Sequence, residues 1–124
     1  MKEILYSKKA PSPIGPYSQA IGMDNLIFTS GQIALNAEGV LVSEEIKEQT
    51  RQVIINLKGI LEDNRSSLNQ VIKTIVFLKD INEFPEMNEV YGEYFNESQP
   101  ARSTVEVCRL PKGAKVMIEV IAFR

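Results

Sequence analysis

Two stretches with the apolar spacing of amphipathic helices, separated by one run of β-branched residues, constrain the fold of this chain most strongly. The first helix is predicted to begin at Ser43, an N-cap residue, with Glu44 and Glu45 in the first turn, where acidic side chains are favourable. Its apolar face consists of residues at helical spacing: Ile46, Val53, Ile54, Leu57, Ile60 and Leu61. Asn82 is predicted to cap a second helix, which ends before Pro100. The buried stripe of that helix is largely aromatic: Phe84, Met87, Val90, Tyr91, Tyr94 and Phe95.

The segment Val71–Leu78, between the two helices, is dense in β-branched residues and predicts a central strand. Its apolar residues occur at both alternating positions, so either both faces are covered within the chain or one face contacts another subunit. A bare face of this kind would be an apolar patch too large for a monomer. We therefore expect the chain to form an oligomer.

The other strands are expected near the two ends of the chain. They are predicted at residues 3–6, 19–23, 26–29, 102–108 and 116–123. Asp24 and Asn25 suit the two-residue turn of a first hairpin, and the Leu110–Gly113 turn suggests a second hairpin. Residues 10–16 contain three prolines and predict a stiff loop. The order ββ(β)αβαββ predicts one α+β domain over residues 1–124, with both helices on one face of a mostly antiparallel or mixed sheet.

The absence of histidine removes the Ser-His-Asp triad, the Cys-His dyad and histidine metal ligation. Cys108, the single cysteine, cannot supply the several thiolates of a zinc or iron–sulfur site, so we expect no metal and a reducing, cytoplasmic compartment. Fourteen basic residues against sixteen acidic ones give a net charge of −2, and nucleic acid is therefore not an expected partner. No apolar run is long enough to span a membrane.

Few side chains remain for ligand chemistry. Arg102 lies at the start of a predicted strand, and its planar guanidinium can hold a small carboxylate by two parallel hydrogen bonds. The backbone at Ser30–Gly31 can donate amide groups to a ligand, and Tyr17 can form one wall of a pocket. Asn88 lies off the apolar stripe of the second helix. Each has an ordinary structural alternative: a surface ion pair for the arginine, a strand-ending turn, core packing for the tyrosine, and a solvated asparagine.

Five blocks of sequence, taken as a set, carry a family resemblance. They are Ile14–Gln19, Thr29–Ile33, Val76–Asp80, Pro100–Ser103 and Glu119–Ala122. With these blocks the chain resembles the Rid (YjgF) family of reactive intermediate deaminases over essentially residues 4–123. The resemblance implies a chorismate-mutase-like fold and a homotrimer whose sheets close a central barrel, with ligand clefts between subunits. It also implies hydrolysis of 2-imino or enamine acids, such as 2-iminobutanoate and 2-iminopropanoate, to 2-oxo acids and ammonia, with no metal or cofactor.

The resemblance also implies roles for individual residues. Carried over position by position, it makes Arg102 the group that binds the substrate carboxylate, with Tyr17, Ser30, Gly31 and Asn88 lining the cleft. An imine carbon is already electrophilic, so such an enzyme mainly has to fix the acid and hold a water in line. That positioning task needs no histidine.

Two further cleft positions depart from the family pattern. Thr104 stands where many relatives have a cysteine, a residue of similar size. Met117 stands where typical deaminases have a glutamate that is thought to orient the attacking water. Because strand residues two apart share a face, Glu119 lies about 6.5 Å further along on the same side. It is the carboxylate expected to substitute, as a catalytic residue beside Arg102.

Two functions remain open from the sequence. The first is an imine deaminase, a hydrolase that acts on the C=N bond. The second is a non-catalytic trimeric member that binds a small carboxylic acid and serves regulation, because Met117 removes the usual carboxylate. In both cases the expected partner is a small imino, enamine or 2-oxo acid.

Overall fold

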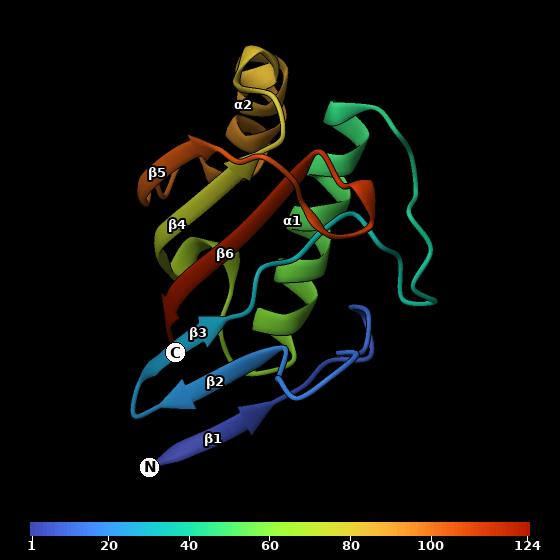
Figure 1. The fold of residues 1–124 in the computed structure, drawn as a ribbon. Coiled ribbons are helices and arrows are strands. Elements are labelled where there is room, and N and C mark those ends of the chain that lie inside the picture. The colour runs from blue at the N-terminus through green and yellow to red at the C-terminus, as the bar shows by residue number, and fades with distance from the viewer.

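The computed structural model describes residues 1–124, which form six strands and two α-helices (Figure 1). The strands are β1 (Lys2–Leu5), β2 (Ala20–Met23), β3 (Leu26–Thr29), β4 (Val71–Leu78), β5 (Ala101–Glu106) and β6 (Val116–Phe123). The helices are α1 (Ile46–Glu62) and α2 (Phe84–Phe95). The sheet order is β1-β2-β3-β6-β4-β5, and every pair is antiparallel except the parallel β4–β5 pair.

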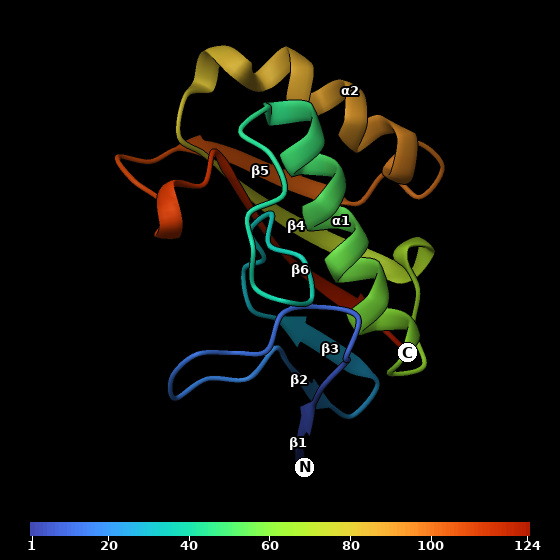
Figure 2. The same ribbon diagram turned by 90° about the vertical axis from the view of Figure 1, so that its right-hand side faces the viewer.

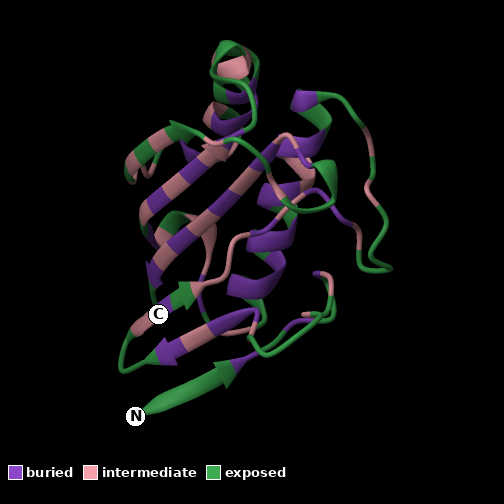
Figure 3. Ribbon diagram, viewed as in Figure 1, coloured by how far each residue is buried: buried purple, intermediate pink, exposed green.

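Both helices lie on the same side of the sheet, with α1 packed over β6 and against α2 (Figure 2). Burial alternates along β4 and β6, because successive side chains of a strand point to opposite faces (Figure 3). The core lies between the helices and the buried sheet face. Its fully buried members include Val53, Leu57, Ile60, Val76, Leu78 and Ile118. The predicted α+β architecture, with a mixed sheet and two helices on one face, is confirmed. Neither helix combines the length and apolarity needed to cross a lipid bilayer.

The first predicted hairpin is also confirmed. β2 and β3 pair antiparallel around Asp24–Asn25, and Asp24 has a φ of 54°. A left-handed backbone at this point matches the twist of the two strands, and aspartate tolerates it better than most residues. The hairpin therefore forms from the local chemistry of its turn.

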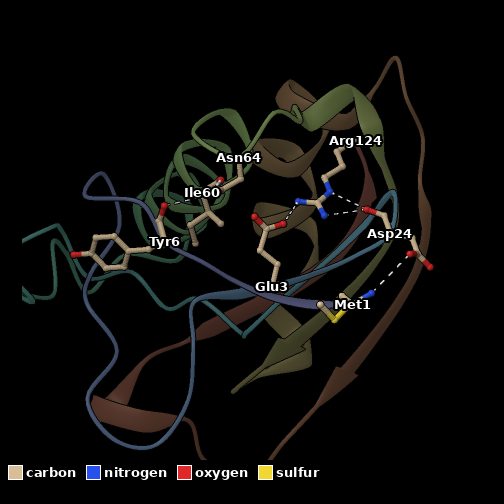
Figure 4. A network of polar contacts seen from close by, with 7 residues as sticks. All are labelled: Met1, Glu3, Tyr6, Asp24, Ile60, Asn64 and Arg124. Carbon is tan, nitrogen blue, oxygen red and sulfur yellow. Dashed lines mark hydrogen bonds and ion pairs between the residues drawn. The ribbon is translucent and has the colours of Figure 1, made fainter.

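The C-terminal arginine ties this hairpin to the end of the chain (Figure 4). The Arg124 guanidinium donates to a carboxylate oxygen of Glu3 at 2.9 Å and to the backbone oxygen of Asp24 at 2.9 and 3.1 Å. A Cβ on Gly22 would lie 2.8 Å from an Arg124 nitrogen, so glycine is what allows the guanidinium to cross the hairpin. These contacts tie the edge strand β1 and the β2–β3 turn to the residue that follows β6.

The predicted second hairpin is wrong. β5 pairs parallel with β4, and β6 lies between β3 and β4 without pairing to β5. β6 buries every second residue and so requires a covered, internal position, whereas β5 buries none and forms the sheet edge. Residues 107–115 carry the chain across, through a 3-10 turn at Pro111–Gly113, instead of closing a tight hairpin.

Both predicted helix caps also need correction. α1 begins at Ile46, because the Ser43 hydroxyl accepts the Glu45 N–H at 3.0 Å and closes a local turn before the helix. The Asn82 N–H donates to the Asp80 carboxylate at 2.9 Å, which caps a 3-10 turn at residues 81–83. α2 then begins at Phe84. In both places a side chain accepts the N–H of the residue two positions later, and this local turn precedes the α-helix instead of capping it.

The sheet face opposite the helices carries a set of apolar side chains. They come from three neighbouring strands and are half-buried or exposed: Phe28, Ile75, Phe77, Met117 and Ile121. Glu119 lies on the same face, opposite Ile75 in the β4–β6 register. No helix of the chain covers this open face (Figure 2).

Candidate functional site

Arg102 leaves the edge strand β5 on the side that carries α2. It lies beside Thr74 in the β4–β5 register, and its guanidinium donates to the Asn88 side-chain oxygen at 2.7 Å. The guanidinium carbon lies 4.6 Å from the centre of the Tyr91 ring and 5.2 Å from that of Phe84. These three α2 residues are spaced four and three apart, so they share one face of the helix.

No carboxylate lies within ion-pair distance of Arg102. Its partners are one neutral amide and two ring faces, which orient the guanidinium without neutralising its charge. The alternative of a surface arginine paired with an acidic neighbour therefore does not describe this residue. A guanidinium held in this way keeps donors for an anionic ligand.

The Tyr91 phenol anchors the ring on which Arg102 lies. Its hydroxyl and the Thr74 hydroxyl are 2.8 Å apart in a buried contact. Burial raises the pKa of Tyr91, while the hydrogen bond with Thr74 and the charge of Arg102 act in the opposite direction. A cavity of about 380 Å³ opens beside this group and is lined by Asn88, Tyr91 and Arg102, among others.

A second cavity, of about 300 Å³, lies beside Gly31 and Met117. The Gln32 N–H donates to the Ile118 oxygen at 2.9 Å, and the Ile118 N–H donates back at 3.1 Å, so residues 30–32 run along β6. A Cβ on Gly31 would lie 2.7 Å from the Met117 sulfur. Glycine therefore allows the thioether to lie across the main chain. The Gly31 N–H donates to no backbone carbonyl of the chain.

The proline-rich loop brings Tyr17 to the same cavity. Gly15 has a φ of 123°, a conformation open to glycine, and the Tyr17 N–H donates to its oxygen at 2.9 Å. The buried side chain of Gln19 donates to the backbone oxygens of Ser7 and Pro11 at 3.0 and 2.9 Å. These bonds fix the loop against the hairpin, and the Tyr17 ring remains 54% exposed at the cavity wall.

The structure thus divides the predicted residues into two half-sites. The arginine half-site contains Arg102 and Asn88, and the glycine half-site contains Tyr17, Gly31 and Met117. Arg102 projects from the helix-covered side of the sheet, whereas Met117 belongs to the open face, opposite Phe77. Within one chain, the cavity beside Arg102 contains no member of the glycine half-site, and the cavity beside Gly31 contains no member of the arginine half-site.

The remaining predicted residues lie outside both cavities. The Ser30 hydroxyl donates to the Ser18 oxygen at 2.6 Å, although its backbone adjoins Gly31. Thr104 lies on β5 beside Val76, and Glu119 makes no ion pair. No three side chains of Cys, Asp or Glu converge as a metal ligand set would.

Sequence reasoning missed the aromatic support of Arg102. Helical spacing predicts Phe84 and Tyr91 in the buried stripe of the second helix, and both also contact the guanidinium. Their spacing around Asn88 was the available signal, since positions 84, 88 and 91 fall on one helix face. The sequence did not show that β5 would bring an arginine to that face.

Comparisons with known proteins agree with this fold and with the sequence blocks. A family model described as Endoribonuclease L-PSP matches residues 7–124. A RutC family protein of Pyrococcus abyssi is 56% identical over 124 residues, covering 99% of this chain and 98% of the relative. Reactive Intermediate Deaminase A, chloroplastic, of Arabidopsis thaliana is 45% identical, covering 98% of this chain and 65% of that protein. The crystal structure of E. coli TdcF with bound serine has a TM-score of 0.92 at 40% identity, covering 98% of each chain. The chain therefore belongs to the Endoribonuclease L-PSP family, the Rid (YjgF) family that its sequence blocks resemble.

Proposed function

We propose that this protein hydrolyses small 2-imino or enamine acids and that Arg102 binds their carboxylate. The observation that carries the proposal is a guanidinium at a cavity wall, held by Asn88 and two rings, with no carboxylate to neutralise it. In the reaction, water adds to the imine carbon and the resulting carbinolamine expels ammonia. A 2-imino acid and one water thus give a 2-oxo acid and ammonia.

The complete site is proposed to form between two copies of the chain. Support comes from the division of the half-sites between the two sides of the sheet, and from the apolar open face. An apolar face of this kind is typical of a surface that contacts another subunit. The homotrimer implied by the resemblance would bring the arginine half-site of one subunit to the glycine half-site of its neighbour.

The proposed chemistry consists mainly of positioning. Arg102 would fix the acid, and the Gly31 N–H, which donates to no backbone carbonyl, would donate to the bound ligand. Holding an electrophilic carbon and a water in line lowers the barrier without a strong base. Glu119, which has no ion-pair partner and lies on the same face as Met117, is the carboxylate proposed to orient the water.

Two relatives are consistent with a small acid as ligand. The Arabidopsis relative is named a reactive intermediate deaminase, and the TdcF structure is described with bound serine, a small carboxylic acid. The second candidate function, a binder of small carboxylic acids without turnover, is favoured by one observation. Met117 lies across Gly31, and no acidic side chain lines the cavity there.

The test is ammonia release from 2-iminobutanoate generated enzymatically in the assay. In the presence of the wild-type protein, ammonia is expected to be released faster than in buffer alone. Arg102→Ala is expected to lose about 100-fold, because two charge-assisted hydrogen bonds contribute about 3 kcal/mol. Arg109→Ala removes an exposed arginine from the connection after β5 and serves as the matched control.

The assay separates the two functions. A wild-type rate equal to that of the solvent, together with Arg102-dependent binding of 2-oxobutanoate, would establish the binder in place of the deaminase. Met117→Glu would then be expected to introduce activity. An unchanged rate in Arg102→Ala would reject the deaminase mechanism.

A further inference from the structure

We infer that the cavity of the glycine half-site receives the side chain of the bound acid, and that Met117 makes the protein selective for acids with hydrocarbon side chains. This inference rests on the proposed function and specifies its substrate class. It concerns the group attached to the imine carbon, whereas the proposed function concerns the carboxylate and the imine.

The lining of the cavity supplies the first argument. Its larger apolar members are Ile14, Ile33, Leu35, Pro111 and Met117. Lys112 is the only charged side chain among the lining residues, and none is acidic. At about 300 Å³ the cavity is at the lower end of small-ligand pockets. It therefore suits a short side chain, and most of its lining residues are apolar.

The position of Met117 supplies the second argument. Its Sδ and Cγ atoms would lie 2.7 and 2.8 Å from a Cβ on Gly31, so the thioether covers the main chain at the cavity wall. A thioether is a poor hydrogen-bond acceptor and donates nothing. A ligand hydroxyl placed against it loses its hydrogen bonds to water and gains none in return. A methyl group at the same place makes binding more favourable, because its apolar surface is removed from water.

Four polar side chains line the cavity beside this apolar surface: Ser12, Tyr17, Gln32 and Lys112. The Tyr17 hydroxyl accepts the Ile14 N–H at 3.4 Å, and the Ser12 hydroxyl is 2.9 Å from that of Tyr6. In the proposed function the Gly31 N–H donates to the ligand near the imine. A ligand side chain that ends against Met117, Ile33 and Leu35 meets hydrocarbon and sulfur.

The test compares two stable 2-oxo acids of equal length, 2-oxobutanoate and 3-hydroxypyruvate, which end in a methyl and a hydroxyl group. Calorimetric titration of the wild-type protein is expected to give about tenfold tighter binding of 2-oxobutanoate. Met117→Gln keeps the length and adds hydrogen-bonding groups, so the preference is expected to fall to about twofold or less. Met117→Leu is expected to keep a preference near the wild-type value.

A second variant guards against misfolding of β6. Ile14 is 78% exposed in the proline-rich loop, so Ile14→Ser leaves the core intact while removing hydrocarbon from the cavity. It is expected to lower the preference about threefold. Val40→Ser, at another exposed apolar loop residue that lies outside this cavity, is the matched control.

The outcomes separate the inference from the proposed function. Equal binding of the two acids by wild type, or an unchanged preference in both Met117→Gln and Ile14→Ser, would overturn the inference while Arg102-dependent binding left the proposed function standing. Binding of neither acid, or binding unaffected by Arg102→Ala, would overturn both.

Discussion

Arg102 combines three contacts that together present its charge. The Asn88 oxygen takes one donor, and the rings of Phe84 and Tyr91 cover part of the guanidinium. The Tyr91 ring is in turn fixed by the hydroxyl contact with Thr74. A side chain with this many restraints loses less freedom when it binds an anion than a solvated arginine would. In the proposed function, Tyr91 is therefore a positioning residue.

Replacing Tyr91 separates the ring from its hydroxyl. Tyr91→Phe keeps the surface under Arg102, and the affinity for 2-oxobutanoate is expected to change by less than threefold. Tyr91→Leu removes a cation–π contact of about 1 kcal/mol, and the affinity is expected to fall about fivefold. Calorimetric titration measures both values, and urea unfolding reports the change in stability separately. Equal losses of affinity in the two variants would show that the ring does not position Arg102.

Some residues of the candidate site could be predicted from the sequence, and others could not. The arginine and Asn88 could be chosen from residue type and from the family resemblance, and they lie in contact. The family pattern and strand alternation together predict Glu119 on the same face as Met117, and it lies on that face but lines neither cavity. The role of Tyr91 depends on which strand lies under α2, and no local pattern contains that information.

Among the elements, the apolar faces were predictable and the strand order was not. Every residue of the predicted face of α1 is buried, because helical periodicity reports directly on packing. The second hairpin was wrong because β5 and β6 are close in sequence but are separated by β4 in the sheet. β6 is apolar at every position but one and β5 is mostly polar, so the composition of each strand, rather than the turn between them, favours the internal position of β6.

α1 and α2 are joined by a ladder of ion pairs. Lys47 pairs with Glu89, and Arg51 pairs with Glu93 at 2.6 Å. The hydrogen bond from Lys47 lowers the pKa of Glu89, and the same contact raises the pKa of Lys47. Arg51 is half-buried and the other three groups are exposed, so the ladder is expected to be sensitive to salt.

The pH dependence of this ladder can be tested at Glu89. A carboxyl with a lowered folded-state pKa stabilises the fold above its ordinary value of 4.5, and that contribution is lost as the pH falls through the folded-state pKa. Wild type is expected to unfold at higher urea concentration than Glu89→Gln at pH 7, with the difference shrinking below about pH 4.5. Unfolding curves between pH 3 and 7 at low salt measure it. A difference independent of pH would mean that the charge of Glu89 makes no contribution.

At the scale of the whole molecule, the two half-sites and the open face require a common explanation. Arg102 and Met117 lie on opposite sides of the same sheet, and within one chain they line two separate cavities. The open face is apolar at Phe28, Phe77 and Ile121. A second copy seated on this face would cover it and could bring its own arginine to the glycine half-site. Val71–Leu78 has apolar residues on both faces of the strand. This pattern alone, without the family resemblance, indicated a sheet face that needs cover from another subunit.

Mixing two inactive chains tests the shared site most directly. Arg102→Ala disables the arginine half-site, and Gly31→Leu fills the glycine half-site, where even a Cβ would meet Met117. Each variant alone is expected to bind no 2-oxobutanoate by calorimetry. An equimolar mixture, unfolded and refolded together, is expected to recover about a quarter of the wild-type binding sites, because chance pairing joins the two intact half-sites at that frequency. Wild type refolded in the same way sets the scale. Recovery of no sites in a mixture that forms the same oligomer as wild type would contradict the shared site.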